Sequence, residues 1–324
     1  MAEAEITVVV PAYNLGDFIE DCLLSVVAQR FTVFECIVVD DGSTDDTAAR
    51  AALIADPRIR IVRQDNAGVS AARNRGLAEA RGEFVMFLDG DDRLHPEALG
   101  RLLQGLRANP ASVASFGTLR KILVDGTPYP GEKPLALATY PTGDVLEPML
   151  RENFLANGGH VLVRTAAARA LGGFDTGLRL SEDWQFWCRL AASGEFHYIG
   201  AVPEVFYLRM RPGSSSGGLA SEWRNHQAAI RAVLDDPTIK ARFDPAKWQQ
   251  LERAVTASHR WEAGRVNFTV RNFPVARRLM LKSLSEDPKP KRLILFALAQ
   301  LSQLLDRSLV SRLRFARDDA ALVA

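Results

Sequence analysis

The sequence lacks any run of about 20 apolar residues that could span a bilayer. It also lacks the basic n-region and the apolar h-region of a secretory signal peptide, because two acidic residues precede only a short apolar stretch at its start. Cysteine is scarce: Cys22, Cys36 and Cys188 are far apart, odd in number and without a C-x-x-C pair, so no disulfide framework is expected. Cys22 and Cys36 lie in apolar contexts and are interpreted as reduced core residues. We therefore expect a cytoplasmic protein in a reducing compartment.

The chain also lacks an excess of charge of either sign. Its 40 Lys and Arg residues nearly balance its 39 Asp and Glu residues, and the net charge of +1 gives no reason to expect a nucleic-acid partner. Apolar residues make up 47% and charged residues 24%, as in an ordinary soluble globular protein. A length of 324 residues accommodates one large α/β domain and a further region of roughly 100 residues.

Short apolar runs alternate with helical patterns in the first third of the chain. Near-continuous apolar runs, typical of parallel strands buried on both faces, occur at residues 6–11, 35–40, 59–63 and 83–88. Helical patterns follow them at residues 17–29, 45–55, 69–80 and 96–107. Ser43 or Thr44 is the expected N-cap of the second helix, and Pro96 suits the first position of the fourth. Four such units predict a doubly wound, mostly parallel sheet, which collects ligands at the carboxyl ends of its strands.

The remainder of the chain divides into a mixed part and a helical part. Strands are expected at residues 112–119, 160–164 and 197–208, with a Gly172-Gly173 turn and a helix at 181–193. The segment RPGSSSGG at 211–218 predicts a flexible loop rich in hydrogen-bond donors, and the pattern from Leu219 onward is wholly helical. We therefore expect an α/β domain at residues 1–216 and a helical C-terminal region at residues 217–324.

Acidic residues gather where the predicted strands end. Asp40 and Asp41 follow the second strand, and Asp89, Asp91 and Asp92 follow the fourth. An acidic pair can simply cap the next helix, and for Asp40 this alternative stays open. Three carboxylates within four residues repel one another unless a cation neutralises them. Mg²⁺ or Mn²⁺ is the natural candidate, because such ions prefer one or two carboxylates together with diphosphate oxygens.

The segments VVVPAYN, IVVDDGSTDDT, NAGVSAARNRGL and FLDGDD occur in this order, and GGFD and SEDWQFWCRLAASG follow them. In these segments, over about residues 5–216, the chain resembles the family 2 glycosyltransferases. The resemblance implies a GT-A fold and a metal-dependent, inverting transfer of a sugar from a nucleotide diphosphate donor to an acceptor hydroxyl. It also implies a uridine (or thymidine) donor, Mn²⁺ or Mg²⁺ as cofactor, a glycan or glycolipid acceptor, and a role in the assembly of surface polysaccharide or glycolipid.

The resemblance assigns donor-side roles to residues that match the family's motifs. Tyr13, beside Pro11, would lie against the nucleotide base, and Asp41 would accept the N3–H of uracil in a charge-assisted hydrogen bond. Asn66 matches an N-x-G turn beside the donor. Arg73 matches an arginine that faces the nucleotide, with a surface ion pair as the alternative.

The same resemblance divides the acidic triplet. Asp89 would face the ribose and the metal, and Asp91 would ligate the metal directly. Asp92 would support these two residues or cap a helix.

The segment SEDW contains the expected catalytic base. Inversion at an anomeric carbon requires a base that takes the acceptor proton while the nucleotide diphosphate leaves on the opposite side, and the matching residue is Asp183. Trp184, on the acceptor side, would desolvate this carboxylate and raise its pKa toward neutrality. Glu182 would hold the acceptor or orient the loop. The alternative is that Ser181 caps an amphipathic helix and that the acids only begin it.

The loop after the last predicted strand departs from the family's pattern. Many relatives have a histidine near a run of serines there, whereas this chain reads RMRPGSSS. Arginine does not ligate a metal but pairs bidentately with phosphate, so Arg211 is the expected diphosphate contact and Arg209 the second choice. A mobile, solvated loop is the alternative. His160 lies in the part of the family that meets acceptors, but a lone histidine is more often structural.

Basic residues gather near the C-terminus, where residues 289–317 contain seven Lys or Arg and one acid. One apolar helical face is predicted, made of Ile294, Leu298, Leu301, Leu305 and Leu309. We expect this face first of all to pack against helices at 248–270 and 274–285. The alternatives are a peripheral contact with the anionic inner face of a membrane and a homodimer interface.

Two other functions compete with sugar transfer. A sugar nucleotidyltransferase would need a Gly-rich basic loop after the first strand, and the segment PAYNLGDF has no Lys or Arg. A non-catalytic scaffold would bind a partner through its C-terminal helices and would tolerate the loss of the D-x-D and E-D acids, but both acid pairs are intact.

Overall fold

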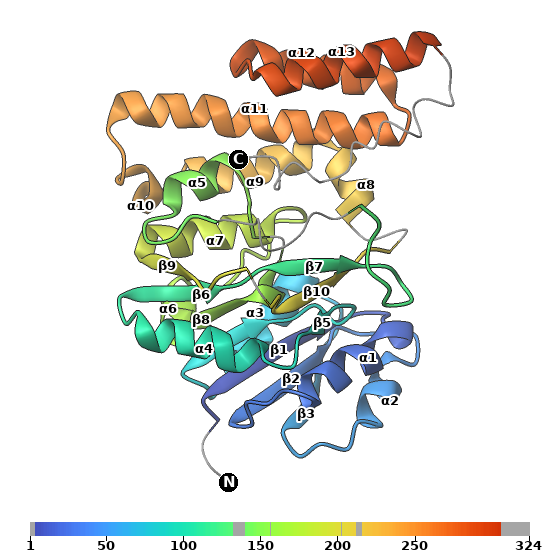
Figure 1. The fold of residues 1–324 in the computed structure, drawn as a ribbon, viewed down its shortest axis with the longest axis vertical. Helices are drawn as coiled ribbons and strands as arrows, with labels where there is room; N and C mark the ends of the chain where they lie inside the picture. Colours follow the sequence, from blue (N-terminus) through green and yellow to red (C-terminus); the bar gives the residue numbers. More distant parts are fainter. Residues whose placement is uncertain (1–3, 132–139, 156, 202, 212–215, 306–324) are drawn as a thin grey trace. The chain divides into compact units, whose positions relative to one another are not determined.

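The computed structural model describes residues 4–131, 140–155, 157–201, 203–211 and 216–305 (Figure 1). The chain forms two compact units. The first comprises Met1–Met149, Asn153–Gly177 and Glu182–Pro212, and the second comprises Leu150–Glu152, Leu178–Ser181 and Gly213–Ala324. Two short segments from within the α/β part of the chain therefore belong to the second unit.

In the described part of the first unit, seven strands form one sheet in the order β3-β2-β1-β4-β8-β6-β9. They are β1 (Ile6–Ala12), β2 (Phe34–Asp40), β3 (Ile59–Arg63), β4 (Phe84–Phe87), β6 (Ser112–Phe116), β8 (Val161–Arg164) and β9 (Glu195–Tyr198). The pairs β1–β2, β1–β4, β2–β3 and β6–β9 are parallel, whereas β8 is antiparallel to β4 and β6. The predicted mostly parallel sheet is thus confirmed, and β8 makes it mixed.

A smaller sheet has the order β5-β10-β7 in the described residues, with β5 (Arg93–Leu94), β7 (Leu119–Ile122) and β10 (Phe206–Arg209). The predictions of single strands at 112–119 and 197–208 are therefore wrong, because each range is divided between the two sheets. Glycine marks both breaks. Gly117 packs so tightly that a Cβ there would lie 2.8 Å from Val205 Cγ2, and Gly200 follows β9 with a φ of 96°.

Helices cover both faces of the main sheet. They are α1 (Gly16–Val27), α2 (Thr47–Ala52), α3 (Val69–Glu79), α4 (Ala98–Ala108), α6 (Thr165–Ala170) and α7 (Glu182–Ser193). Every residue of β1 and β2 is buried, as their continuous apolar runs predict. Side chains alternate between the faces of a strand, so Val8 and Val10 share a core with Leu23 of α1 and Leu102 of α4. On the opposite face α3 comes so close that only Gly76 fits against Val9.

Two predicted helix starts are wrong. The second helix, α2, begins at Thr47 with Asp46 as its N-cap, and the hydroxyls of both predicted caps are instead bonded to Asn14: Ser43 Oγ accepts from its backbone N–H at 3.1 Å and Thr44 Oγ1 donates to its side-chain oxygen at 3.3 Å. The fourth, α4, begins at Ala98, two residues after Pro96. The free cysteines Cys22 and Cys36 are buried in the core, as expected.

The second unit is helical in its described residues, which confirms the helical C-terminal region. It contains α8 (Ser216–Ser221), α9 (Trp223–Leu234), α10 (Pro237–Lys240), α11 (Pro245–Thr269), α12 (Phe273–Glu286) and α13 (Pro290–Leu305), and α5 (Leu146–Arg151) ends in it. Trp261 and Phe268 of α11 pack with Met280 of α12 and Ala299 of α13. Among the described residues, no helix combines the length and the apolar character that a bilayer span requires.

The predicted apolar face of α13 is only partly described, since Leu309 lies outside the described residues and the side chains of Leu301 and Leu305 are not among those placed. Ile294 is 62% exposed and Leu298 is 39% exposed. The expectation that this face packs on α11 and α12 is therefore wrong for these two residues. The adjacent stripe of Leu295, Phe296 and Ala299 packs instead.

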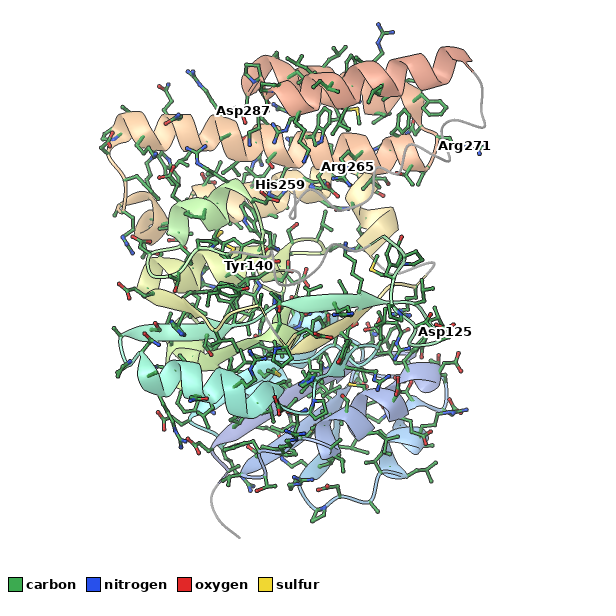
Figure 2. The ribbon with its side chains drawn as sticks, viewed as in Figure 1. Asp125, Tyr140, His259, Arg265, Arg271 and Asp287 are labelled. Carbon is green, nitrogen blue, oxygen red and sulfur yellow. The ribbon has the colours of Figure 1, made fainter. Side chains whose placement is uncertain are left out.

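Two histidines meet between α9 and α11 (His259 is labelled in Figure 2). The Nδ1 atoms of His226 and His259 lie 3.3 Å apart, and His226 Nε2 lies 2.9 Å from the carbonyl oxygen of Ala220. Burial lowers the pKa of both rings, to about 3 for His259, and the neighbouring His226 adds to the effect on His259. Both rings are therefore neutral in the folded protein near pH 7.

Acidification is expected to destabilise the protein through His259. Its pKa is lower when folded than in the unfolded chain, so this stabilisation is complete above about pH 6.5 and is lost as the pH falls. Between pH 8 and pH 5 the loss should amount to about 2 kcal/mol. Urea unfolding at both pH values measures it, with His259→Gln as the control that cannot titrate. An equal pH dependence in the two proteins would contradict the prediction.

Candidate functional site

The carboxyl ends of β2, β1 and β4 lie side by side, because these strands are parallel neighbours in the sheet. Pro11 is buried within β1, and Tyr13, just beyond the strand, is 48% exposed. Asn14 adopts a positive φ of 51°, and its side-chain oxygen accepts a hydrogen bond from the backbone N–H of Thr44 at 2.8 Å. The first two strand ends are thus tied together, with one aromatic ring left open to solvent.

Asp41 holds the loop that follows β3. Its carboxylate accepts hydrogen bonds from the side chain of Gln64 (2.8 Å) and from the backbone N–H groups of Ala67 (2.9 Å) and Gly68 (2.8 Å). The Asn66 side chain donates to the carbonyl oxygen of Asp41 at 3.0 Å. A carboxylate offers about four acceptor positions, and these three hydrogen bonds use three of them. The recognition of the nucleotide base by Asp41 stays a prediction. In the structure the Asp41 carboxylate holds the loop at residues 64–68.

Arg73 connects two of the predicted motifs. This buried side chain of α3 donates to Asp89 Oδ1 at 2.8 Å and to Glu182 Oε1 at 3.0 Å, and its guanidinium lies 5.1 Å from the centre of the Phe174 ring. Burial alone would lower the pKa of Arg73, but the Asp89 and Glu182 carboxylates outweigh it and raise the pKa above its ordinary value. The surface ion pair considered as its alternative is therefore excluded. One carboxylate of FLDGDD and one of SEDW, Asp89 and Glu182, therefore share the Arg73 guanidinium.

Asp92 is the buried member of the acidic triplet. It is 2% exposed, and its carboxylate accepts from the backbone N–H of Arg209 (2.7 Å) and from the Asn157 side chain (2.8 Å). Burial, followed by the neighbouring Asp91 and Asp89, raises its pKa well above the ordinary value. Asp92 caps no described helix. It attaches β10 to the end of β4 and supports the other two acids.

Asp91 is paired with Arg211. The Arg211 Nε atom lies 2.6 Å from Asp91 Oδ2, and the Asp91 side chain remains 18% exposed. Burial and the nearby Asp89 raise the pKa of Asp91, while Arg211 opposes the rise. A cation is thus already present at the residue expected to ligate a metal. The expected diphosphate contact and the expected metal ligand are neighbours.

The donor set at this point fits a small divalent cation. In the described parts of the chain, no group of three or more His, Cys, Asp or Glu side chains is arranged to hold a metal alone. Asp91 and Asp89 alone would offer one or two oxygen ligands, which is the number Mg²⁺ takes when a diphosphate and water complete its coordination. Asp91 pairs with one cation in this structure, the Arg211 guanidinium.

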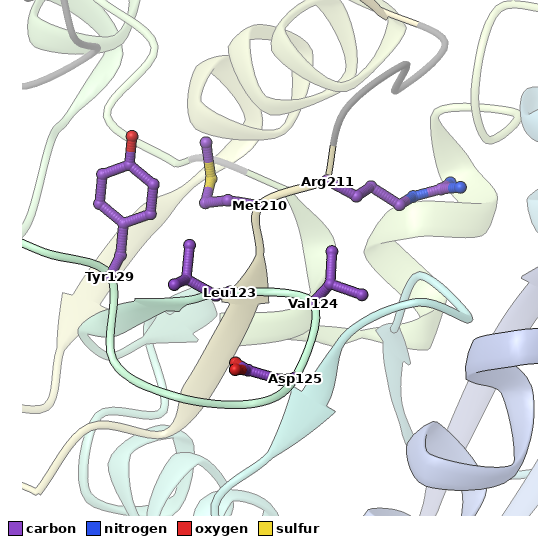
Figure 3. A pocket seen from close by; sticks show the side chains of 6 residues that line it. All are labelled: Leu123, Val124, Asp125, Tyr129, Met210 and Arg211. Carbon is purple, nitrogen blue, oxygen red and sulfur yellow. The ribbon is translucent and has the colours of Figure 1, made fainter.

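A pocket of about 620 Å³ lies beside this pair, lined by Leu123, Val124, Asp125, Tyr129, Met210 and Arg211 (Figure 3). Its walls come from the segment that follows β7 and from the two residues after β10. In Figure 3 the Arg211 side chain extends away from Tyr129. The pocket combines apolar walls with one aromatic ring, one cation and one acid.

Arg209 and His160 both have structural partners. Arg209 is 7% exposed and donates to the carbonyl oxygens of Asp91 (2.8 Å) and Val124 (2.5 Å) and to the Asp21 carboxylate. It therefore holds the strands around the acids instead of offering its guanidinium to a phosphate. His160 Nδ1 lies 2.7 Å from the Gly117 carbonyl oxygen, and burial lowers its pKa to about 4.

Asp183 lies in the first turn of α7, directly after Glu182. It is partly buried, and Asn153 Nδ2 lies 3.5 Å from its Oδ2 atom. Burial, and after it the Glu182 charge, raise the pKa of Asp183 to about 7. Trp184 is 1% exposed and donates to the Met149 carbonyl oxygen at 2.8 Å. Contrary to the expectation of an acceptor-side surface, Trp184 shapes the surroundings of Asp183 from inside the fold.

Three asparagines contribute to this site but are not predicted from the sequence. Asn157 lies between Asp92 (2.8 Å) and Asp89 (3.4 Å), and Asn153 lies beside Asp183. Asn74 exchanges two hydrogen bonds of 2.8 Å with the backbone of Phe174, which places the Phe174 ring under Arg73. Only Asn74 carried a signal, since it follows Arg73 in the segment NAGVSAARNRGL. The other two are brought in by tertiary contacts alone.

Residues 7–170 match the sequence profile of the family described as Glycosyl transferase family 2. The uncharacterized protein MT1568 of Mycobacterium tuberculosis is 34% identical over 250 residues, which cover 74% of this chain and 75% of MT1568. The succinoglycan biosynthesis protein ExoO of Rhizobium meliloti is 33% identical over 221 residues, covering 65% and 62%. The uncharacterized glycosyltransferase YibD of Escherichia coli is 42% identical over 94 residues, covering 28% and 27%. The chain thus spans less than two thirds of ExoO and YibD.

Solved structures show the same fold at low identity. Staphylococcus aureus TarS 1–349 in complex with UDP-GlcNAc superposes with a TM-score of 0.64 at 18% identity, covering 92% of this chain and 87% of that one. The mannosyltransferase PcManGT from Pyrobaculum calidifontis, in complex with GDP-Man and Mn²⁺, gives a TM-score of 0.59 at 19% identity, covering 96% and 84%. These likenesses confirm the GT-A fold.

The family profile covers half of the chain, and the segments that carry it converge at one edge of the sheet. The chain belongs to glycosyl transferase family 2.

Proposed function

We propose that this protein is an inverting glycosyltransferase that moves a sugar from a uridine (or thymidine) diphosphate donor to an acceptor hydroxyl. The observation that carries the proposal is the double ion pair of Arg73, which joins the donor-side Asp89 to Glu182, the neighbour of the candidate base. The donor and the acceptor hydroxyl could then be bound next to each other. The convergence also counts against a non-catalytic scaffold, which has no need to hold these acids together.

The donor would lie at the carboxyl ends of β1, β2 and β4. The half-exposed ring of Tyr13 offers a stacking surface for a base, and the remaining acceptor position of Asp41 suits the N3–H of a uracil. The likeness to TarS in complex with UDP-GlcNAc and to the succinoglycan biosynthesis protein ExoO supports a uridine donor and a polysaccharide product. PcManGT in complex with GDP-Man is the opposing example.

Mn²⁺ or Mg²⁺ would be held by Asp91 and Asp89, and when bound it would supply positive charge to the departing diphosphate. Arg211, which now pairs with the Asp91 carboxylate, would pair with the same phosphates, because a guanidinium binds phosphate as readily as carboxylate. Asp92 and Arg209 keep these residues in place from below.

Asp183 would take the proton of the acceptor hydroxyl. With a pKa of about 7, roughly half of the carboxyl is ionised at neutral pH, and the base is strong enough to accept a proton as the new glycosidic bond forms. The electron pair of the broken bond leaves with the nucleotide diphosphate on the opposite face of the sugar. Glu182, already held by Arg73, would position the acceptor.

UDP with Mn²⁺ is expected to raise the melting temperature more than GDP, CDP or ADP with Mn²⁺. A ligand at 100 times its Kd stabilises the folded protein by about 2.7 kcal/mol, which corresponds to roughly 5 °C for a chain of this size. Thermal-shift assays with the four nucleotides measure the ranking. Equal shifts for all four, or a preference for GDP, would contradict the assignment of Asp41 to a uracil.

A further inference from the structure

Helices α12 and α13 carry exposed apolar side chains that belong to no described core. Leu281 of α12 is 45% exposed, and Leu293, Ile294 and Leu298 of α13 are 49%, 62% and 39% exposed. On each helix the buried residues lie on another stripe, with Met280 of α12 and Ala299 of α13 in the core that α11 completes. These four residues are exposed and lie outside the described core of this unit.

Exposed cations lie on the same two helices or just before their first residues. They are Arg271, Arg277, Arg278, Lys282, Lys289 and Lys291, and together with the four apolar residues they are called the α12–α13 face. Figure 2 labels Arg271 just before α12 and Asp287 just after it. On α12 the spacing of 277, 278, 281 and 282 places cations and an apolar side chain on one side of the helix.

The acids of this segment do not cancel its charge. Between Arg271 and Leu298 the sequence contains only Glu286 and Asp287. Glu286 is paired with Arg260 and lies 3.8 Å from Lys282, and Asp287 lies 3.5 Å from Arg292 and 3.7 Å from Lys289. Each acid thus has a buried or partly buried arginine besides its exposed lysine. The face keeps a net positive charge.

We propose that the α12–α13 face docks on an anionic lipid bilayer. Exposed leucine and isoleucine side chains can insert among the acyl chains, while the surrounding lysines and arginines contact the headgroups. A second copy of the chain fits less well, because a two-fold interface would bring the same cations face to face. A nucleic acid would leave the apolar side chains without a partner. This docking does not depend on which sugar or acceptor the enzyme uses.

Co-sedimentation of the full chain with vesicles tests the proposal. Binding is expected to vesicles of phosphatidylglycerol and phosphatidylcholine, to weaken as salt is raised, and to be much weaker with phosphatidylcholine alone. The variant Arg277→Glu/Arg278→Glu should bind the anionic vesicles at least tenfold more weakly, since each charge near such a surface contributes about a fivefold factor. Both residues are exposed, so circular dichroism should show an unchanged fold.

A matched control changes the same number of charges elsewhere in the unit. Arg231 of α9 and Lys240 of α10 are also exposed, and Figure 1 shows α9 and α10 on the other side of α11 from α12 and α13. Arg231→Glu/Lys240→Glu should therefore retain most of the binding. Equal losses in the two double variants would overturn the proposal, as would equal binding to neutral and anionic vesicles.

The apolar half of the proposal has its own variant. Leu293→Ser/Ile294→Ser keeps every charge, and it should weaken vesicle binding while leaving the protein folded. Sedimentation velocity without lipid separates docking from self-association. A dimer that this variant dissociates would overturn the membrane assignment in favour of a second copy of the chain.

Discussion

Replacing Asp183 by Asn is expected to lower turnover by roughly 10²–10⁴-fold while the affinity for the donor stays close to that of the wild type. Asn keeps the size of the side chain and an oxygen that can accept from the Trp184 backbone N–H, which now lies 2.7 Å from Asp183 Oδ1. It removes the carboxylate that would take the acceptor proton. Donor affinity should persist because the donor-side residues, Tyr13 and Asp41, lie at other strand ends. Steady-state kinetics with calorimetry of nucleotide binding measures both quantities.

The dependence of turnover on pH is a second test of Asp183. The pKa of Asp183 is raised to about 7 by burial, so the fraction of ionised base grows as the pH rises through 7. Wild-type turnover should therefore rise by up to about tenfold per pH unit below the pKa and level off above it. The residual turnover of Asp183→Asn should lack this rise with pH. A carboxyl of ordinary pKa would produce the rise near pH 4 instead.

Glu182→Gln is the matched comparison, because Glu182 is the adjacent acid and is held by Arg73 at 3.0 Å. It should raise the KM for the acceptor and keep the rise of turnover with pH, moved to lower pH because the Glu182 charge that helps raise the pKa of Asp183 is gone. If Asp183→Asn transfers sugar at the wild-type rate, Asp183 has no part in the chemistry. Glu182 would then be the next carboxylate to test as the base.

The parallel strands and the motif positions could be predicted from the sequence because both are local. Continuous apolar runs such as VVVP indicate strands buried on both faces, and the acids that follow them reach one edge once the strands are parallel. What the acids bind inside the protein could not be predicted. The partners of Asp92 are Asn157 and the backbone of Arg209, which lie 65 and 117 residues away in the sequence.

The C-terminal helix shows a different limit. Apolar residues of α13 occupy two adjacent stripes, Ile294 with Leu298 and Leu295 with Ala299, and periodicity gives no rule for which stripe is buried. The choice depends on the shape of α11 and α12. The single strand predicted at 112–119 is wrong for a similar reason, since its division at Gly117 depends on a close approach by Val205.

Replacing Arg73 by Met is expected to destabilise the protein by about 3–5 kcal/mol, the usual cost of removing one partner from a buried ion pair. Arg73 is 4% exposed and serves Asp89 and Glu182 together. Without it both carboxylates would remain close together with no cation, next to Asp183. Because the Asp89 side chain is 26% exposed and that of Glu182 is 16% exposed, water relieves part of the penalty and the upper value is a limit.

Arg75 supplies the matched control from the same helix. Its Nε atom lies 2.6 Å from Glu79, but its side chain is 52% exposed, so Arg75→Met should cost less than about 1 kcal/mol. Urea unfolding of the two variants measures the difference. In the background of Arg73→Met, the further change Glu182→Gln should recover part of the lost stability, because it removes one of the two charges left without a cation. Equal costs for Arg73→Met and Arg75→Met, or no recovery in the double variant, would mean that Arg73 fills space in α3 and does not hold the two motifs together.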